Sequence, residues 1–247
     1  MRKFGLIGYP LTHSFSQRFF TEKFEREGIA GCVYTNFSLS SIEALPAVLT
    51  DTEICGLNVT IPYKEKVLDY LDDLSPVARA IGACNCIRIE SERIVGHNTD
   101  VVGFERSLLP LIIDRYYPHP RALILGRGGA AKAVEYVVNR MGLEYRMVTR
   151  GVKKDPADLH YEELDEAMVS RYQLIINTTP LGMYPHVDEC PPLPYEAIGS
   201  DHILFDLIYN PATTLFLQKG EERGAKVKNG YEMLVLQAEE SWRIWNS

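Results

Sequence analysis

Short apolar runs alternate with longer stretches of helical periodicity along the chain, and this alternation limits the possible folds more than any other feature. Each run is rich in Val, Ile, Leu or Tyr and is bounded by Gly, Pro, Asn or Ser. Because most runs are apolar throughout, we expect strands that are buried on both faces. The sequence therefore predicts an α/β fold with mostly parallel sheets covered by helices. The expected strands are Lys3–Gly8, Cys32–Leu39, Gly56–Thr60, Asn85–Glu90, Ala122–Gly126, Glu144–Thr149, Leu174–Thr178 and Ile203–Ile208.

A break in this alternation predicts two α/β units. A long helix is expected over residues 100–116, closed by Pro118-His119-Pro120, and a new strand follows it. The chain has 247 residues, a length that allows one large domain or two small ones. Shorter helices are expected over 16–27 and 130–140, each followed by a glycine suited to a helix end. We place the start of the second unit within or just after the long helix.

Composition excludes several classes of protein. Lys and Arg number 26 and Asp and Glu number 33, which gives a net charge of −7. Such a chain is a poor general binder of nucleic acid or of anionic membranes, and no apolar run reaches the ~18 residues of a membrane span. The five cysteines lack the paired spacing of a zinc site, so we expect no metal. Scattered thiols and the absence of a signal-peptide pattern favour the cytoplasm.

The strongest local motif is a glycine-rich turn between a predicted strand and a predicted helix. Gly126-Arg127-Gly128-Gly129-Ala130-Ala131 matches G-x-G-x-x-[GA]. Glycines let backbone N–H groups approach a pyrophosphate, and the helix N-terminus adds partial positive charge. The alternative is a tight turn that merely needs glycine. Arg127 either adds charge to this loop or is an ordinary exposed side chain.

The end of the next predicted strand indicates which dinucleotide binds. An NAD site needs an acid about 20 residues after the glycines, but the strand ends in Thr149-Arg150, followed by Lys153 and Lys154. A guanidinium suits a 2′-phosphate, which favours NADP(H) over NAD(H). The alternative is a solvated basic turn. Thr178 and Tyr209 follow later strands, where such sheets bind ligands, although Thr178 also suits a helix cap.

The first half of the chain must then supply the chemistry. Its unusual segments are Gly8–Ser16, Asn58–Lys64, Gly82–Cys86 and Asn98–Asp100, each at the expected end of a strand. Neutral donors and acceptors there predict a pocket for a small, hydroxyl-rich molecule. Lys64 is the natural proton donor and Asp100 would orient it. The alternative for Lys64 and Asp100 is a surface ion pair.

Together these segments resemble the shikimate dehydrogenase family. The family pattern runs G-x-P-x-x-H-S-x-S, N-V-T-x-P-x-K, G-A-x-N, N-T-D and G-x-G-G-A, and all five occur here in that order. Later family motifs are Asn177-Thr178-Thr179, the segment from Asp206 to Pro211, and the closing segment from Asn229 to Gln237. The resemblance covers nearly the whole chain.

The resemblance implies NADP-dependent, reversible reduction of 3-dehydroshikimate to shikimate. We expect a monomer or homodimer. It implies a substrate-binding and catalytic domain of residues 1–101 with 231–247, a Rossmann-like NADP domain of residues 102–230, and a last helix that returns to the first domain. The implied catalytic pair is Lys64 and Asp100. The implied substrate ligands are Ser14, Ser16, Thr60, Asn85, Tyr209 and Gln237. The implied cofactor ligands are Gly126, Arg127, Gly128, Gly129, Ala130, Ala131, Thr149, Arg150, Thr178, Gly230 and Met233.

Some positions depart from the family pattern. Gln17, Phe20, Cys86, Arg127 and Thr149 replace residues that are more usual there. None of these removes an implied catalytic group, but they leave open the fine substrate preference and how strongly the phosphate of the cofactor is held. The alternatives are a quinate/shikimate enzyme that uses NAD, and a non-catalytic NADP(H)-binding sensor on the same fold.

Overall fold

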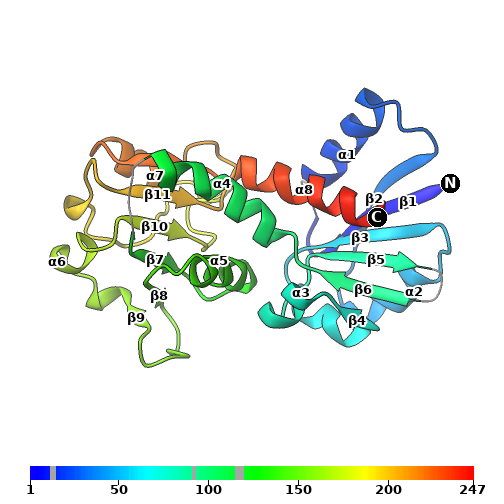
Figure 1. Ribbon diagram of the computed structural model, residues 1–247, viewed down its shortest axis with the longest axis horizontal. Coiled ribbons are helices and arrows are strands. Elements are labelled where there is room, and N and C mark those ends of the chain that lie inside the picture. Colours follow the sequence, from blue (N-terminus) through cyan, green and yellow to red (C-terminus); the bar gives the residue numbers. More distant parts are fainter. Residues whose placement is uncertain (12–14, 91–92, 115–119) are drawn as a thin grey trace. The chain divides into compact units, whose positions relative to one another are not determined.

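The computed structural model describes residues 1–11, 15–90, 93–114 and 120–247. The chain divides into two compact units (Figure 1). The first comprises Met1–Thr99 with Ala238–Ser247, and the second comprises Asp100–Gln237. Each unit contains one six-stranded sheet and its own helices, so the predicted α/β class is confirmed.

The sheet of the first unit has the strand order β2-β1-β3-β5-β6-β4. All neighbours pair in parallel except β5, which is antiparallel to both β3 and β6. The sheet is therefore mostly parallel, as predicted. The sequence missed β6, in which Ile94 and Val95 are the two large apolar residues, and β4, which has only two residues. The bounds are β1 Arg2–Gly8, β2 Cys32–Ser38, β3 Ile54–Val59, β4 Asp73–Leu74, β5 Cys86–Glu90 and β6 Arg93–His97.

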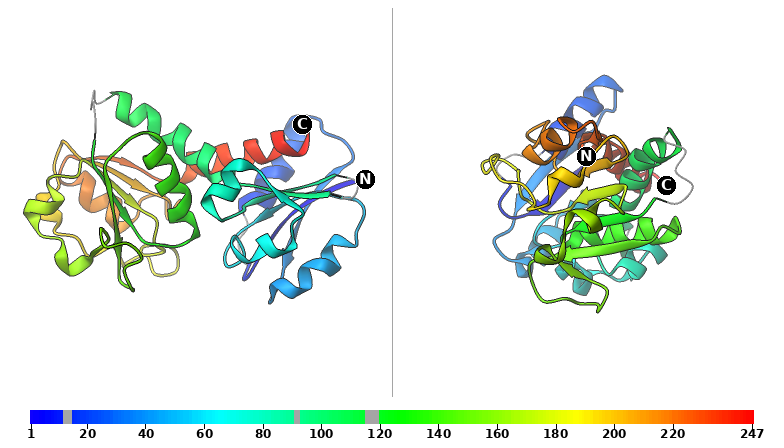
Figure 2. Two further views of the ribbon diagram at one scale, coloured as in Figure 1. Left: turned by 60° about the horizontal axis from the view of Figure 1, so that its bottom comes forward. Right: turned by 90° about the vertical axis from the view of Figure 1, so that its left-hand side faces the viewer.

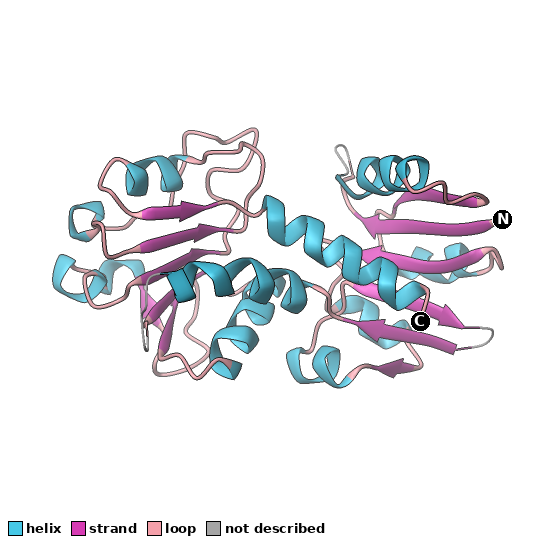
Figure 3. Cartoon of the chain, turned by 45° about the horizontal axis from the view of Figure 1, so that its top comes forward, coloured by secondary structure: helices cyan, strands magenta, loops and turns pink. Residues whose placement is uncertain are grey.

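Side chains of β1 enter two hydrophobic clusters of the first unit. Phe4 and Leu6 pack with Phe20 of α1 (Phe15–Arg26) and with the end of α8 (Tyr231–Trp245), whereas Ile7 packs with Leu45 of α2 (Leu45–Leu49). Because successive side chains of a strand point to opposite faces, β1 has helices on both sides (Figure 3). The helices are α1 Phe15–Arg26, α2 Leu45–Leu49 and α3 Pro76–Ile81, with single-turn 3₁₀ helices η1 Ile42–Ala44 and η2 Lys66–Tyr70.

The sheet of the second unit has the order β12-β11-β10-β7-β8-β9, and all its strands are parallel (Figure 2). The order reverses between β7 and β10, which is the arrangement of dinucleotide-binding sheets. Its strands β7, β8, β10 and β11 were predicted, while the short edge strands β9 and β12 were not. The bounds are β7 Ala122–Leu125, β8 Tyr145–Thr149, β9 Leu159–His160, β10 Leu174–Asn177, β11 Ile203–Asp206 and β12 Lys226–Lys228.

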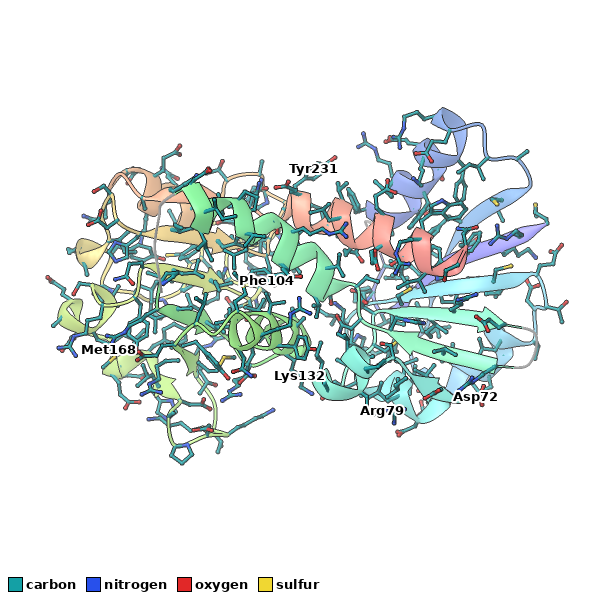
Figure 4. The ribbon with its side chains drawn as sticks, viewed as in Figure 1. Asp72, Arg79, Phe104, Lys132, Met168 and Tyr231 are labelled. Carbon is teal, nitrogen blue, oxygen red and sulfur yellow. The ribbon has the colours of Figure 1, made fainter. Side chains whose placement is uncertain are left out.

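Helices also cover both faces of this second sheet. Phe104 of α4, labelled in Figure 4, meets Phe205 edge-on at 5.2 Å between ring centroids. The neighbouring Leu204 points the other way and packs with Phe216 of α7. The helices are α4 Asp100–Asp114, α5 Gly129–Arg140, α6 Glu166–Val169 and α7 Leu215–Glu221, with η3 Tyr161–Glu163 and η4 Tyr195–Ala197.

The last helix, α8, runs from Tyr231 to Trp245. Its residues up to Gln237 belong to the second unit and those from Ala238 onward to the first, so the helix returns to the first unit as expected. Within the described residues, no helix is long and apolar enough to cross a membrane.

Candidate functional site

The glycine-rich loop joins β7 to α5, as the motif predicts. Gly126 has φ +109°, and a Cβ there would lie 2.7 Å from Oγ1 of Thr178. Both the backbone conformation and this close approach require glycine. Gly128 is the N-cap of α5, and a Cβ on Gly128 would meet nothing within 4 Å. The loop therefore leaves open space beside the first backbone amides of a helix, which is where phosphates bind.

The carboxyl ends of β7, β8 and β10 meet at the point where the strand order reverses. Thr178, just after β10, donates its hydroxyl to the carbonyl of Leu125 at 2.6 Å. Thr149 ends β8 and its Oγ1 accepts the N–H of Gly151 at 3.0 Å, which forms the turn. Arg150 follows and is exposed. The structure thus brings Thr149 and Thr178 to the edge beside Gly126, while Ala131 is buried in the core.

Asp206 organises the neighbouring strand end. Its carboxylate accepts hydrogen bonds from Thr214 Oγ1 (2.6 Å), Asn177 Nδ2 (3.1 Å) and the N–H of Ile208 (3.0 Å). Burial raises the pKa of Asp206 to about 6, although these donors oppose the shift. Tyr209 lies just beyond, half-buried, and burial raises its pKa as well.

The start of α8 packs closely against this strand end. A Cβ on Gly230 would lie 2.1 Å from the carbonyl oxygen of Leu207, so only glycine fits. Met233 and Gln237 of α8 are buried, and Gln237 donates from Nε2 to the carbonyl of Leu234 at 3.0 Å. The second unit therefore contains the predicted residues Tyr209, Gly230, Met233 and Gln237.

In the first unit, predicted substrate-binding residues join a buried hydrogen-bonded network. Ser16 hydrogen-bonds to Tyr34, whose hydroxyl donates to Asn58 Oδ1 at 2.8 Å. Asn58 Nδ2 donates to Ser241 Oγ of α8 at 2.9 Å. Tyr34 is fully buried, and this burial raises its pKa well above the usual value, so its hydroxyl stays protonated and donates.

The network continues through Ser241 to the segment that precedes α4. The Ser241 hydroxyl lies 3.3 Å from Thr99 Oγ1. The N–H of Thr99 donates to Asn85 Oδ1 at 2.6 Å, and Asn85 Nδ2 donates to Thr99 Oγ1 at 3.0 Å. The network therefore links α1, four separate strands or strand ends and α8 into one fixed arrangement.

Four members of this network were not predicted from the sequence, namely Tyr34, Asn58, Thr99 and Ser241. Asn58 and Thr99 stand inside the noted family motifs, so those motifs contained the signal. Ser241 could have been found as a polar residue between Ala238 and Trp245 on a helix with a buried face. Nothing local distinguishes Tyr34 from other strand residues.

The remaining predicted residues fall at the ends of other elements. Thr60 follows β3, and its N–H donates to the carbonyl of Ile7 at 2.9 Å. Lys64 is half-buried in the first unit, while Asp100 is buried and begins α4 in the second unit. Ser14 and His13 lie outside the described residues.

Arg127 of the glycine loop is held by two carboxylates. Its side chain is 18% exposed and forms ion pairs with Asp158 and Glu135, so it is not an ordinary exposed side chain.

Among the residues that the structure describes, no group of three or more His, Cys, Asp or Glu side chains is placed to hold a metal ion.

Comparisons with known proteins identify relatives over the full length. Residues 6–87 match the model of the shikimate dehydrogenase substrate-binding domain. Shikimate dehydrogenase (NADP(+)) of Caldicellulosiruptor saccharolyticus is 38% identical, over 99% of this chain and 92% of that protein.

Solved structures agree with this assignment. Shikimate dehydrogenase 1 of Peptoclostridium difficile has a TM-score of 0.83 and 37% identity, covering 100% of this chain and 92% of that one. The Thermus thermophilus shikimate 5-dehydrogenase, solved with NADP(H) and shikimate, has a TM-score of 0.87 and 31% identity, covering 99% of this chain and 93% of that one. By sequence and by fold, this chain belongs to the shikimate dehydrogenase family.

Proposed function

We propose that this protein is an NADP-dependent shikimate dehydrogenase, which reversibly reduces 3-dehydroshikimate to shikimate in aromatic amino-acid biosynthesis. The observation that carries the proposal is the similarity to a shikimate dehydrogenase (NADP(+)) over 99% of the chain, which includes both units. The proposed substrate-binding domain is residues 1–101 with 231–247, and the proposed NADP domain is residues 102–230.

The glycine loop suits the pyrophosphate of NADP(H). Gly126 and Gly128 leave space for close approach, and the N-terminus of α5 supplies aligned N–H groups. Gly129, Ala130 and Ala131 would contribute backbone only. Thr149 and Arg150 would hold the adenosine ribose phosphate, with Thr178, Gly230 and Met233 along the rest of the cofactor.

In the proposed reaction, NADPH would, when bound, supply the hydride that reduces the ketone carbon of 3-dehydroshikimate. Lys64 donates a proton to the ketone oxygen as negative charge develops there, and it takes the proton back in the reverse direction. Asp100 orients the Lys64 ammonium. Ser14 and Ser16 would hold the substrate carboxylate, with Tyr209 near it, and Thr60, Asn85 and Gln237 its hydroxyls.

The buried network of the first unit supports this division of roles. Ser16 and Asn85 are tied through Tyr34, Asn58, Ser241 and Thr99, so their polar groups are fixed before substrate arrives. Preorganised neutral groups bind hydroxyls with little loss of side-chain entropy.

The test is to mix the purified protein with shikimate and NADP⁺ and to record absorbance at the NADPH band. We expect NADPH to form, with slower turnover when NAD⁺ replaces NADP⁺ or quinate replaces shikimate. Equal or faster turnover with quinate and NAD⁺ would favour the quinate/shikimate alternative. Binding of NADPH without turnover of either acid would favour the sensor.

We further propose a cytoplasmic location. None of the five cysteines, all of which lie in the described part of the chain, forms a disulfide, which suits a reducing compartment. A monomer or homodimer remains the expectation for the oligomeric state, and size-exclusion chromatography with light scattering would test it.

A further inference from the structure

Arg127 places its guanidinium on a buried carboxylate. Nε of Arg127 donates to Asp158 Oδ2 at 3.1 Å, Nη2 donates to Asp158 Oδ1, and Nη1 lies 3.5 Å from Glu135 Oε2. The contact with Asp158 is thus two-pronged, which is the most rigid form of ion pair. The Asp158 side chain is only 2% exposed.

Asp158 also accepts backbone hydrogen bonds from the segment that follows Arg150. Its Oδ2 accepts the N–H of Lys154 at 2.9 Å and the N–H of Asp155 at 3.1 Å. Burial alone would raise the pKa of Asp158, but the hydrogen bonds from Arg127 and from these two amides hold it below its usual range. Asp158 is therefore an ionised anchor with the glycine loop on one side and the basic segment on the other.

The basic segment itself contains the group expected to recognise a 2′-phosphate. Arg150 is exposed, and no hydrogen bond or ion pair to its guanidinium is found in the described part of the chain. Lys153 pairs with Glu163 at 2.6 Å. One end of the segment is fixed where β8 pairs with β7, and the other is fixed by the Asp158–Arg127 pair.

We propose that Arg127 is a positioning residue for the choice of NADP(H) over NAD(H), an inference that rests on the proposed function. Through Asp158 it holds residues 150–154 in the conformation that receives the 2′-phosphate. It does not bind the pyrophosphate. Turning its guanidinium to a phosphate would leave a buried carboxylate without its cation, which is strongly unfavourable.

The test measures dissociation constants by calorimetry for NADPH, NADH and adenosine 2′,5′-bisphosphate. Arg127→Gln and Asp158→Asn are each expected to raise the constants for NADPH and the bisphosphate about tenfold, and that for NADH less than about twofold. The double variant should bind NADPH no more weakly than the single variant with the larger dissociation constant, because both changes break the same link. Arg127→Lys should restore part of the selectivity.

Arg121→Gln is the matched control. Arg121 is an exposed arginine of the same unit that pairs with Glu144 at 3.0 Å, and its loss should change no constant. If a single variant fails to fold, the double variant still decides the matter, since it replaces the pair with two neutral amides and leaves no unpaired buried charge.

Two results would overturn the inference while leaving the proposed function intact. If Arg127→Gln weakened the binding of NADPH and NADH equally, and Asp158→Asn changed neither dissociation constant, Arg127 would be a pyrophosphate ligand. An unchanged ratio of NADPH to NADH constants with a lowered melting temperature would make the pair purely structural. If the unchanged protein bound neither NADPH nor the bisphosphate, the proposed function and the inference would both be overturned.

Discussion

The two units fix their candidate binding groups in different ways. In the first unit, side chains hold the binding groups in position, because Tyr34, Asn58 and Ser241 hydrogen-bond to one another and to predicted substrate ligands inside the protein. In the second unit, the backbone itself provides the binding groups, since Gly126 and Gly128 shape a loop at the start of a helix. A small polyol demands many exact donors and acceptors, whereas a pyrophosphate needs only open space and N–H groups. The expected consequences of this contrast can be tested separately in each unit.

The largest effect is expected for Lys64→Ala. Removing the proposed proton donor should lower kcat by about 100-fold or more, because its contribution is made in the transition state. The dissociation constant of NADPH should stay unchanged, since Lys64 belongs to the first unit. Steady-state kinetics and fluorescence titration measure the two quantities. Lys66→Ala, at an exposed lysine nearby, is the control, and turnover of Lys64→Ala within a few-fold of the unchanged enzyme would refute the role.

Asn58→Ala should affect the first unit in two ways. It removes the acceptor of the buried Tyr34 hydroxyl and the donor to the buried Ser241 hydroxyl, so we expect a loss of about 2–3 kcal/mol in the free energy of unfolding. KM for shikimate should rise, with the NADPH constant unaffected. Urea unfolding and kinetics test both points against Asn139→Ala, at an exposed asparagine of α5. A stable variant with normal KM would show that the network does not organise the site.

Asp206→Asn should alter the pH dependence of stability through the second unit. Because burial raises the folded-state pKa of Asp206 to about 6, the folded state holds this proton more tightly than the unfolded state does. Stability from this group is therefore present at about pH 4 and is lost as pH rises towards 6 and above, by on the order of 2 kcal/mol.

The asparagine cannot titrate, so the difference in unfolding free energy between variant and unchanged protein should shift in favour of the variant as pH rises from about 4 to about 7. Urea unfolding at several pH values measures it. Asp188→Asn, at an exposed aspartate, should give a difference that does not vary with pH, and the same flat result for Asp206→Asn would contradict the assignment.

The smallest effect is expected for Gly128→Ala. Because a Cβ there meets nothing within 4 Å, stability should fall by less than about 1 kcal/mol. The added methyl should still occupy space proposed for the pyrophosphate, so the constants for NADPH and NADH should both rise about fivefold. Gly199→Ala, where a Cβ also meets nothing, is the control. Unchanged cofactor constants would remove the loop from the proposed site.

Local patterns predicted the elements well and their partners poorly. The apolar runs of β1, β7 and β10 identify strands because burial on both faces leaves its mark within a few residues. The edge strand β9 has two residues, too few to form a pattern. The turn of Arg127 towards Asp158 depends on a residue 31 positions away, which no local rule ranks above the nearer charges.

The sequence by itself determined the α/β class, the glycine at position 126 and the family, because strand periodicity, a left-handed φ and short ordered motifs are properties of neighbouring residues. Only the tertiary structure decided that Asn58 meets Ser241, 183 positions later, and that Arg127 is held by Asp158. Burial removes such polar groups from water and forces each one to find a partner. The candidates for that partner come from the whole fold, so the choice is made only when distant segments pack together.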